Sequence, residues 1–178
     1  MDTRAEIEPA VAEPCRASAP VTEPPPTLEQ TYRRLAEGLT RFAAGMVGPD
    51  DAPDVVASAV ARCLRTDWST VENGDAYLYR AVYNEATGLR RRFARRAGLA
   101  HRVPRSPTAA EGAERFVDDQ LDIGAALATL SPQQRAVIVL TYWNALPVAA
   151  VAERLDLAEG TVKKQLARGR AKLREELS

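Results

Sequence analysis

Side chains suited to binding nucleic acid are concentrated in the last segment predicted to be helical, residues 157–177 (LAEGTVKKQLARGRAKLREEL). All three lysines of the chain, Lys163, Lys164 and Lys172, lie within it, and no acidic residue occurs between positions 161 and 174. Lysine and arginine donate hydrogen bonds to guanine and to phosphate oxygens, whereas a glutamine such as Gln165 pairs with adenine. The pattern therefore predicts recognition of DNA by hydrogen bonding.

The preceding segment completes a helix-turn-helix pattern. PVAAVAERL is followed by the short turn DLA and then by the basic segment. Apolar residues at helical spacing, such as Val151 and Val162, predict a buried seam between the two helices. In this motif the second helix lies in the major groove with its first residues against the bases. The long donors on that helix are Lys163, Lys164, Gln165, Arg168, Arg170, Lys172 and Arg174. A basic helix that is merely solvated is the alternative interpretation.

A second basic cluster lies near the middle of the chain. The chain is neutral overall, with 24 basic and 24 acidic residues, yet residues 89–105 carry seven arginines and no acid. Arginines this close repel one another unless an anion binds them, which predicts contact with phosphates. Two separate basic patches on a neutral chain are more informative about its partners than a uniformly basic composition would be.

Other classes of function have no supporting residues. The two cysteines and the one histidine form no cluster with zinc spacing, and Cys63 falls on an apolar helical stripe, where we expect a small core residue. No carboxylate dyad, Ser–His–Asp set or phosphate-binding loop is present, so we expect no enzyme, no catalytic residue, no metal and no cofactor. Without a signal-peptide pattern or a membrane-spanning apolar run, we expect a cytoplasmic protein with no membrane insertion.

Apolar periodicity predicts an all-α protein with two small helical domains joined by a flexible linker. Residues 1–26, rich in Pro, Ala and Glu, are expected to be a disordered head. The first domain is predicted to span 27–97, the linker 98–120 and the second domain 121–177. Within the second domain, SPQQ is a strong helix start, because Ser131 and Gln134 match a capping box.

Two segments of the second domain, LSPQQRAV and AERLDLAEGTVK, resemble region 4 of the extracytoplasmic-function (ECF) sigma factors of bacterial RNA polymerase. The resemblance covers the whole second domain and implies recognition of the −35 promoter element. It places Thr161, Lys163, Lys164, Gln165 and Arg168 as the residues that read this element. The GTVK segment alone also occurs in LuxR-type output domains, so the longer match carries the resemblance.

Two upstream segments, GPDDAPDVVASAVARCLR and DAYLYRAVYNEATGLRRRFARR, are similar to region 2 of the same family. The resemblance implies that the first segment docks on the clamp of core RNA polymerase, through Asp54, Val55, Val56, Ala57, Ser58 and Arg62. It implies that the second reads and opens the −10 element, with Arg80 and Asn84 facing bases and Arg90, Arg91 and Arg92 holding phosphates. From the residues alone, an amide beside a loop and an arginine run suits an extruded, unpaired base. Candidates for stacking on such bases are Trp68, Tyr79 and Tyr83.

Some positions depart from the family pattern. Ala57 and Ser58 stand where the docking helix usually carries Gln and Glu, and Gly88 stands where Asp is common. Losing such polar contacts costs about 1–3 kcal/mol each if the partner groups stay buried. The sequence therefore predicts either weakened docking or compensation by another element, such as the acidic head. Ala158 stands where a Ser cap is usual, and Thr161 is a candidate to shift the start of the helix.

These patterns favour an ECF-type sigma factor whose partners are core RNA polymerase, promoter DNA and, as a further candidate, an anti-sigma factor. Two alternatives remain at this point. The first is a sigma-like regulator that binds DNA without initiating transcription, which Ala57, Ser58 and Gly88 favour. The second is a plain helix-turn-helix repressor or activator, which would need no first domain and would bind DNA as a symmetric dimer.

Overall fold

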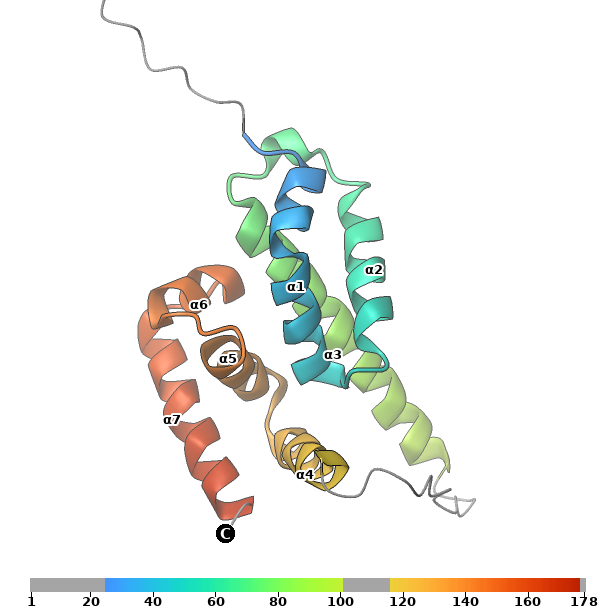
Figure 1. Ribbon diagram of the computed structural model, residues 1–178, viewed down its shortest axis with the longest axis vertical. Helices are drawn as coiled ribbons and strands as arrows, with labels where there is room; N and C mark the ends of the chain where they lie inside the picture. Colours follow the sequence, from blue (N-terminus) through green and yellow to red (C-terminus); the bar gives the residue numbers. More distant parts are fainter. Residues whose placement is uncertain (1–24, 101–115, 177–178) are drawn as a thin grey trace, which may run out of the picture.

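The computed structural model describes residues 25–100 and 116–176, and within these ranges every regular element is helical (Figure 1). The elements are α1 (Leu28–Val47), α2 (Ala52–Cys63), the short 3₁₀ turn η1 (Trp68–Thr70), α3 (Gly74–Ala100), α4 (Phe116–Thr129), α5 (Pro132–Tyr142), α6 (Val148–Leu155) and α7 (Glu159–Glu176). We call α1–α3 the first unit and α4–α7 the second unit. The prediction of an all-α fold is confirmed.

The first unit is a three-helix arrangement around an apolar core. Thr27 caps α1 through a capping box: its hydroxyl accepts from the backbone N–H of Gln30 at 3.2 Å, and Gln30 Oε1 accepts from the backbone N–H of Thr27 at 2.9 Å. Each helix then turns one apolar face inward. The buried residues include Leu39, Phe42, Met46, Val55, Val56, Ala59, Cys63, Leu78 and Val82. The burial of Cys63 confirms its prediction as a core residue.

The second unit is organised around α5, whose residues 135–140 are all buried. The predicted capping box starts this helix, because the Ser131 hydroxyl accepts from the Gln134 N–H at 3.2 Å and Gln134 Oε1 accepts from the Ser131 N–H at 3.1 Å. The long helix α7 packs beside α5. A glycine makes the close approach possible: a Cβ added at Gly169 would lie 3.0 Å from Cγ1 of Ile138.

The two units share one continuous hydrophobic core, with α5 and α6 lying against α1 and α3 (Figure 1). Gly45 on α1 permits this contact, since an added Cβ would lie only 2.6 Å from Cγ1 of Val139. The sequence predicted two linked domains but not this packing. Periodicity shows which face of each helix is apolar, but it does not show which distant helix covers that face.

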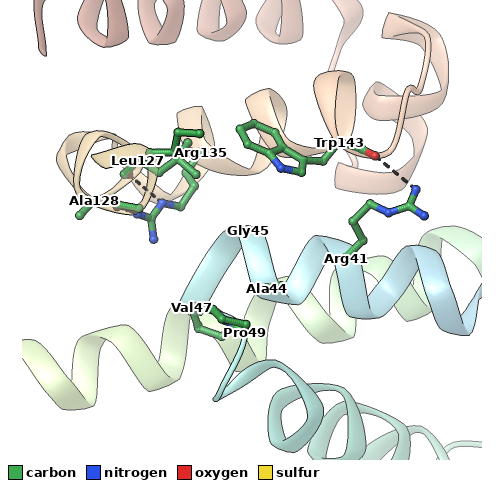
Figure 2. A pocket seen from close by; sticks show the side chains of 12 residues that line it. Arg41, Ala44, Gly45, Val47, Pro49, Leu127, Ala128, Arg135 and Trp143 are labelled. Carbon is green, nitrogen blue, oxygen red and sulfur yellow. Dashed lines mark hydrogen bonds between the residues drawn. The ribbon is translucent and has the colours of Figure 1, made fainter. Parts of the chain in front are cut away.

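A buried arginine joins helix ends at the boundary between the units. Arg135, only 6% exposed, donates from Nη1 to the carbonyl of Met46 and from Nε to the carbonyl of Leu127, both at 2.7 Å. Figure 2 shows the contact with Leu127. These carbonyls lie in the last turns of α1 and α4, where the negative end of the helix dipole lies, and that of Leu127 also accepts from the backbone N–H of Leu130 at 3.2 Å. Burial, reinforced by nearby Arg90, lowers the pKa of Arg135 to about 10. Two helix C-termini thus compensate the buried charge.

Several element boundaries differ from the prediction. Helix α3 continues beyond residue 97 to Ala100, and α4 already begins at Phe116, so both extend into the predicted linker 98–120. Residues 101–115 of that linker and residues 1–24 of the predicted head lie outside the described residues. Helix α7 begins at Glu159, so Thr161 does not shift its start. Among the described helices, none combines the length and the apolar character needed to cross a membrane.

Candidate nucleic-acid interface

The predicted helix-turn-helix is formed by α6 and α7. Asp156 ends α6 in the left-handed conformation (φ 56°), which turns the chain sharply before α7 begins. Val151 and Ala152 of α6 are buried, as are Val162 and Leu166 of α7. The seam that the sequence predicted therefore exists, and it directs the opposite side of α7 to solvent.

The exposed side of α7 carries most of the predicted −35 readers. Lys163, Lys164, Arg168 and Arg170 are exposed, and Thr161 and Gln165 are partly exposed. Lys163 pairs loosely with Glu159 one turn earlier, at 3.7 Å. Lys164 and Arg168 lie one turn apart, so their side chains project from the same part of the helix. This surface can donate several hydrogen bonds to base edges and phosphates at once.

Three of the predicted readers, Gln165, Arg170 and Lys172, contact neighbouring elements. Gln165 Nε2 donates to Gln133 Oε1 on α5 at 3.1 Å, which orients the amide. The Arg170 guanidinium donates to the hydroxyl of Tyr142 and lies 5.3 Å from the centre of its ring. Lys172 Nζ donates to the carbonyl of Thr129 at 2.6 Å. Lys172 therefore stabilises the C-terminal end of α4 in this structure, a role that the sequence did not predict.

Two of the predicted −10 readers, Arg80 and Asn84, line a hollow between α2 and α3. This α2–α3 hollow has a volume of about 370 Å³ and is lined by Arg62, Cys63, Tyr77, Arg80, Ala81 and Asn84. Arg80 and Asn84 are one turn apart on α3, as their spacing predicts. Arg62, which the resemblance assigned to docking, reaches across from α2, lines the same hollow and pairs with the carboxylate of Glu85. A guanidinium, an amide and an aromatic ring converge here, which suits an unpaired base with its phosphates.

The arginine run at the end of α3 divides into two groups. Arg91 and Arg92 are exposed and available to an anion. Arg90 instead turns toward the second unit, where Nη2 lies 3.4 Å from the carbonyl of Ala128, and its Nη1 is buried without a hydrogen-bond partner. Burial accordingly lowers the pKa of Arg90. Only part of the predicted phosphate-binding set therefore faces solvent.

The predicted docking helix α2 is likewise divided between two faces. Asp54, Ala57 and Ser58 are exposed and form an outward face with small side chains. Val55 and Val56 are each 4% exposed and pack into the core, so they hold the helix in place rather than present a contact surface.

The aromatic candidates for base stacking have different surroundings. Tyr79 is buried, packs 5.7 Å from the ring of Phe42 and lies beneath the Arg154 guanidinium, so it is not an open platform in this structure. Trp68 is partly exposed, stacks edge-on against Tyr77 at 5.8 Å, and donates from Nε1 to the carbonyl of Pro26 at 2.9 Å. Trp68 thus fixes the start of α1 against the loop beside the hollow.

Sequence reasoning missed the residues that join the units. Arg135 carried a signal, because a charge within the apolar run 135–140 must find buried acceptors. Asn144 carried no such signal in the sequence. Its Nδ2 donates to the carbonyl of Gly38 at 2.8 Å, across the boundary between the two units. The described residues contain no group of His, Cys, Asp or Glu able to hold a metal ion.

Known proteins match this chain across both units. The family description "Sigma-70, region 4" matches residues 120–173. The "RNA polymerase sigma-E factor" of Streptomyces coelicolor is 35% identical over 153 residues, covering 84% of this chain and 85% of the relative. The "ECF RNA polymerase sigma factor SigL" of Mycobacterium tuberculosis is 32% identical over 142 residues, covering 76% of this chain and 80% of the relative.

Solved structures show the same architecture. The sigma factor RpoE of Bartonella quintana, solved in complex with the anti-sigma factor NepR, aligns with a TM-score of 0.63 and 26% identity over 84% of this chain and 95% of that chain. CnrH, solved in complex with the cytosolic domain of CnrY, aligns with a TM-score of 0.57 at 24% identity, which supports the fold.

A helix-turn-helix with an exposed basic face, packed on a second helical unit that the relatives also match, is the architecture of a sigma factor. The chain belongs to the ECF sigma factors of bacterial RNA polymerase. Proteins of this class direct transcription initiation and in general are not enzymes. The alternative of a sigma-like regulator that does not initiate transcription is not favoured, because the relatives are named RNA polymerase sigma factors. A plain helix-turn-helix regulator is not favoured either, because the relatives match both units.

Proposed function

We propose that this sigma factor binds core RNA polymerase through α2, reads the −35 element with α7 and captures an unpaired −10 base in the α2–α3 hollow. The observation that carries the proposal is the convergence of Arg62, Arg80 and Asn84 around one hollow, separate from the exposed donors of α7. One site suits single-stranded DNA and the other suits the major groove of a duplex. Its place of action is the cytoplasm, where polymerase and DNA are found.

The test is transcription in vitro with core polymerase of the source bacterium and fragments of its genome. Discrete starts that share two spaced elements are expected. Asn84→Ala should reduce promoter opening while binding to duplex −35 DNA is retained. Lys164→Ala should weaken duplex binding and lower the salt slope by about one. Arg33→Ala is the matched control, because Arg33 is exposed on α1 and pairs with Glu29 in its own helix. Core binding without discrete starts would instead support a regulator that does not initiate transcription.

Docking through α2 has its own test. The outward face of α2 offers Ala57 and Ser58 where the family carries longer polar side chains, so the present interface lacks their hydrogen bonds. Ala57→Gln combined with Ser58→Glu should tighten binding to core polymerase about tenfold, which corresponds to about one added charged hydrogen bond. Unchanged affinity would show that α2 contributes no polar contact to docking.

An anti-sigma factor is a further proposed partner. A groove of about 500 Å³ lies where α1, α4 and α5 meet, and two of its lining residues, Ile123 and Trp143, are large apolar side chains left exposed. Figure 2 shows Trp143 on this groove. A partner segment seated there would contact both units together. Substituting Trp143 by Asp should abolish co-purification of such a partner, with Tyr142→Asp, on the neighbouring exposed side chain, as the comparison.

A further inference from the structure

The side of α3 that lines the α2–α3 hollow continues beyond the hollow toward the C-terminal end of the helix. The residues on this side recur at intervals of three or four positions, which keeps them in line along a helix. They are Tyr77, Arg80, Asn84, Gly88, Arg91 and Arg95. The first three line the hollow, and the two arginines at the end lie about two and three turns beyond Asn84. A strand of DNA that enters the hollow can therefore follow a basic surface along α3.

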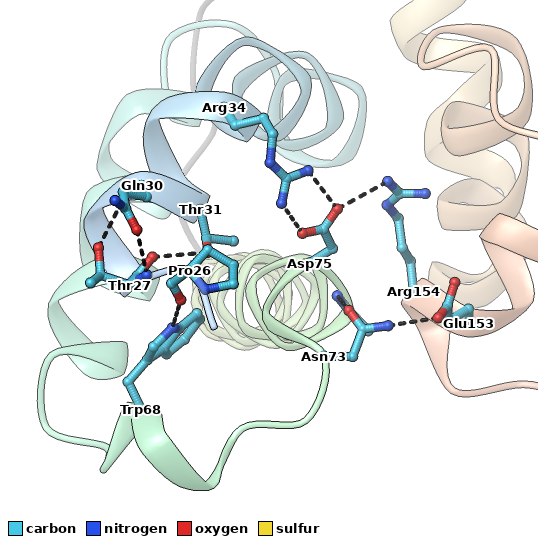
Figure 3. Close-up of polar contacts among 11 residues, drawn as sticks. Pro26, Thr27, Gln30, Thr31, Arg34, Trp68, Asn73, Asp75, Glu153 and Arg154 are labelled. Atoms are coloured by element: carbon cyan, nitrogen blue, oxygen red, sulfur yellow. Dashed lines mark hydrogen bonds and ion pairs between the residues drawn. The ribbon is translucent and has the colours of Figure 1, made fainter. Parts of the chain in front are cut away.

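The loop before α3 lies at the opposite end of the hollow. The Tyr77 hydroxyl is 2.9 Å from the Thr66 hydroxyl, and the Tyr77 ring meets Trp68 edge-on at 5.8 Å. Trp68 is held in turn by the carbonyl of Pro26 (Figure 3). Because these contacts occupy that end, a strand whose base enters the hollow has its open path past Asn84, along α3.

Gly88, one turn beyond Asn84, has no structural reason to be a glycine. It lies in the interior of α3, where glycine is the least favourable residue after proline. Its φ angle is outside the left-handed region, and a Cβ added there would meet Arg92 Nη1 at 3.7 Å, an ordinary contact. At Gly45 and Gly169, by contrast, an added Cβ would come within 3.0 Å of a neighbouring side chain. A glycine that packing does not require is explained by a ligand that approaches the backbone closely.

The Arg92 guanidinium lies over this glycine, and no acid pairs with it. The residues three and four positions from Arg92 are Gly88, Leu89, Arg95 and Arg96, so its own helix offers no carboxylate within reach. Within the part of the chain that the structure describes, Arg92 makes no hydrogen bond or ion pair. The Asp that is common at position 88 in the family would stand four residues before Arg92, which is the spacing of a helical ion pair. Gly88 thus leaves a place beside Arg92 that an anion can fill.

We propose that this place is a subsite for one phosphate of the −10 strand. The phosphate next to the base in the hollow approaches α3 over Gly88 and accepts hydrogen bonds from Arg92, where the carboxylate common in the family would otherwise pair. Guanidinium and phosphate form paired, charge-assisted hydrogen bonds. The turn from Asn84 to Gly88 rises about 6 Å, a distance comparable with the length of one nucleotide in an extended strand. The inference rests on the proposed capture of a −10 base by the hollow, and it makes Gly88 a residue that strengthens binding of the unpaired strand.

Gly88→Asp tests the subsite, because the added carboxylate would pair with Arg92 and exclude the phosphate. The measurement is binding of single-stranded oligonucleotides, carrying a mapped −10 sequence or its scrambled form, to the full chain assembled with core polymerase. Affinity for both oligonucleotides should fall about fivefold. The slope of log affinity against log salt should fall by about 0.7 in magnitude, because one phosphate contact is lost. Thr40→Asp is the matched control, because it adds the same charge at an exposed position of α1.

A double-mutant cycle separates pairing with Arg92 from general repulsion of DNA. In an Arg92→Ala background, Gly88→Asp should change the affinity by less than about twofold, because the group that it neutralises is already gone. A loss of the same size in both backgrounds, or no loss for Gly88→Asp in the unmodified chain, would overturn the inference. Failure of the proposed function has a different signature. The unmodified protein would then bind the mapped and the scrambled oligonucleotides equally, because phosphate contacts carry no sequence information and the hollow would select no base.

Discussion

Replacing Arg135 with methionine tests how the two units are held together. The substitution keeps an apolar stem of similar length but removes the guanidinium that binds the ends of α1 and α4. Its two short hydrogen bonds, each 2.7 Å long, are made by a charged donor. Such bonds contribute about 1.5–3 kcal/mol each, so their sum is about 3–6 kcal/mol.

Burial of the Arg135 guanidinium offsets part of the stabilisation from these hydrogen bonds, as the lowered pKa of Arg135 shows. We therefore expect a loss at the lower end of the range, about 3 kcal/mol of unfolding free energy. Met46 contributes its carbonyl from the first unit and Leu127 from the second, so Arg135→Met should also uncouple the units. A single cooperative transition should become two.

Urea unfolding followed by far-ultraviolet circular dichroism measures both effects. Arg91→Met is the control, because Arg91 is exposed on α3, and its midpoint should match that of the unmodified protein. A loss for Arg135→Met below about 1 kcal/mol, with a single unchanged transition, would refute the reasoning that helix C-termini stabilise this buried charge.

Three further predictions concern caps, close approach and ionisation. Ser131→Ala should lower the free energy of unfolding in urea by about 1 kcal/mol, because alanine cannot cap α5. Ser131→Asp should retain most of that stability, because aspartate caps as serine does. Equal losses for the two variants would argue against capping. Gly45→Val should enlarge the radius of gyration measured by X-ray scattering, since its Cβ would meet Val139 at 2.6 Å, whereas Gly88→Ala should not. Burial raises the pKa of the Tyr79 hydroxyl, so its contribution to stability is present below pH 10, the ordinary pKa, and is lost as pH rises through the raised value. Tyr79→Phe should flatten the fall in stability above pH 10; a fall identical to that of the unmodified protein would show that other groups cause it.

The sequence by itself determined the local structure and much of the chemistry. Capping residues such as Thr27 and Ser131 act within one turn of the backbone, so their effect can be read from neighbouring positions. The seam of the helix-turn-helix follows from apolar spacing, and the donors on α7 must then face away from it. The likeness to sigma regions 2 and 4 rested on such local patterns, and the relatives confirmed the family.

Only the tertiary structure decided which of these residues are available and what they contact. Val55 lies in the predicted docking helix but faces the core, because only one side of α2 is free of α1 and α3. Arg80 was predicted beside DNA and is held by Asp156, a residue far along the chain. The sequence predicted two separate domains and did not reveal that they share one hydrophobic core. Which residues are exposed and which pair depends on how helices distant in the sequence pack together. Gly45 and Gly169 allow two of these helix pairs to approach closely.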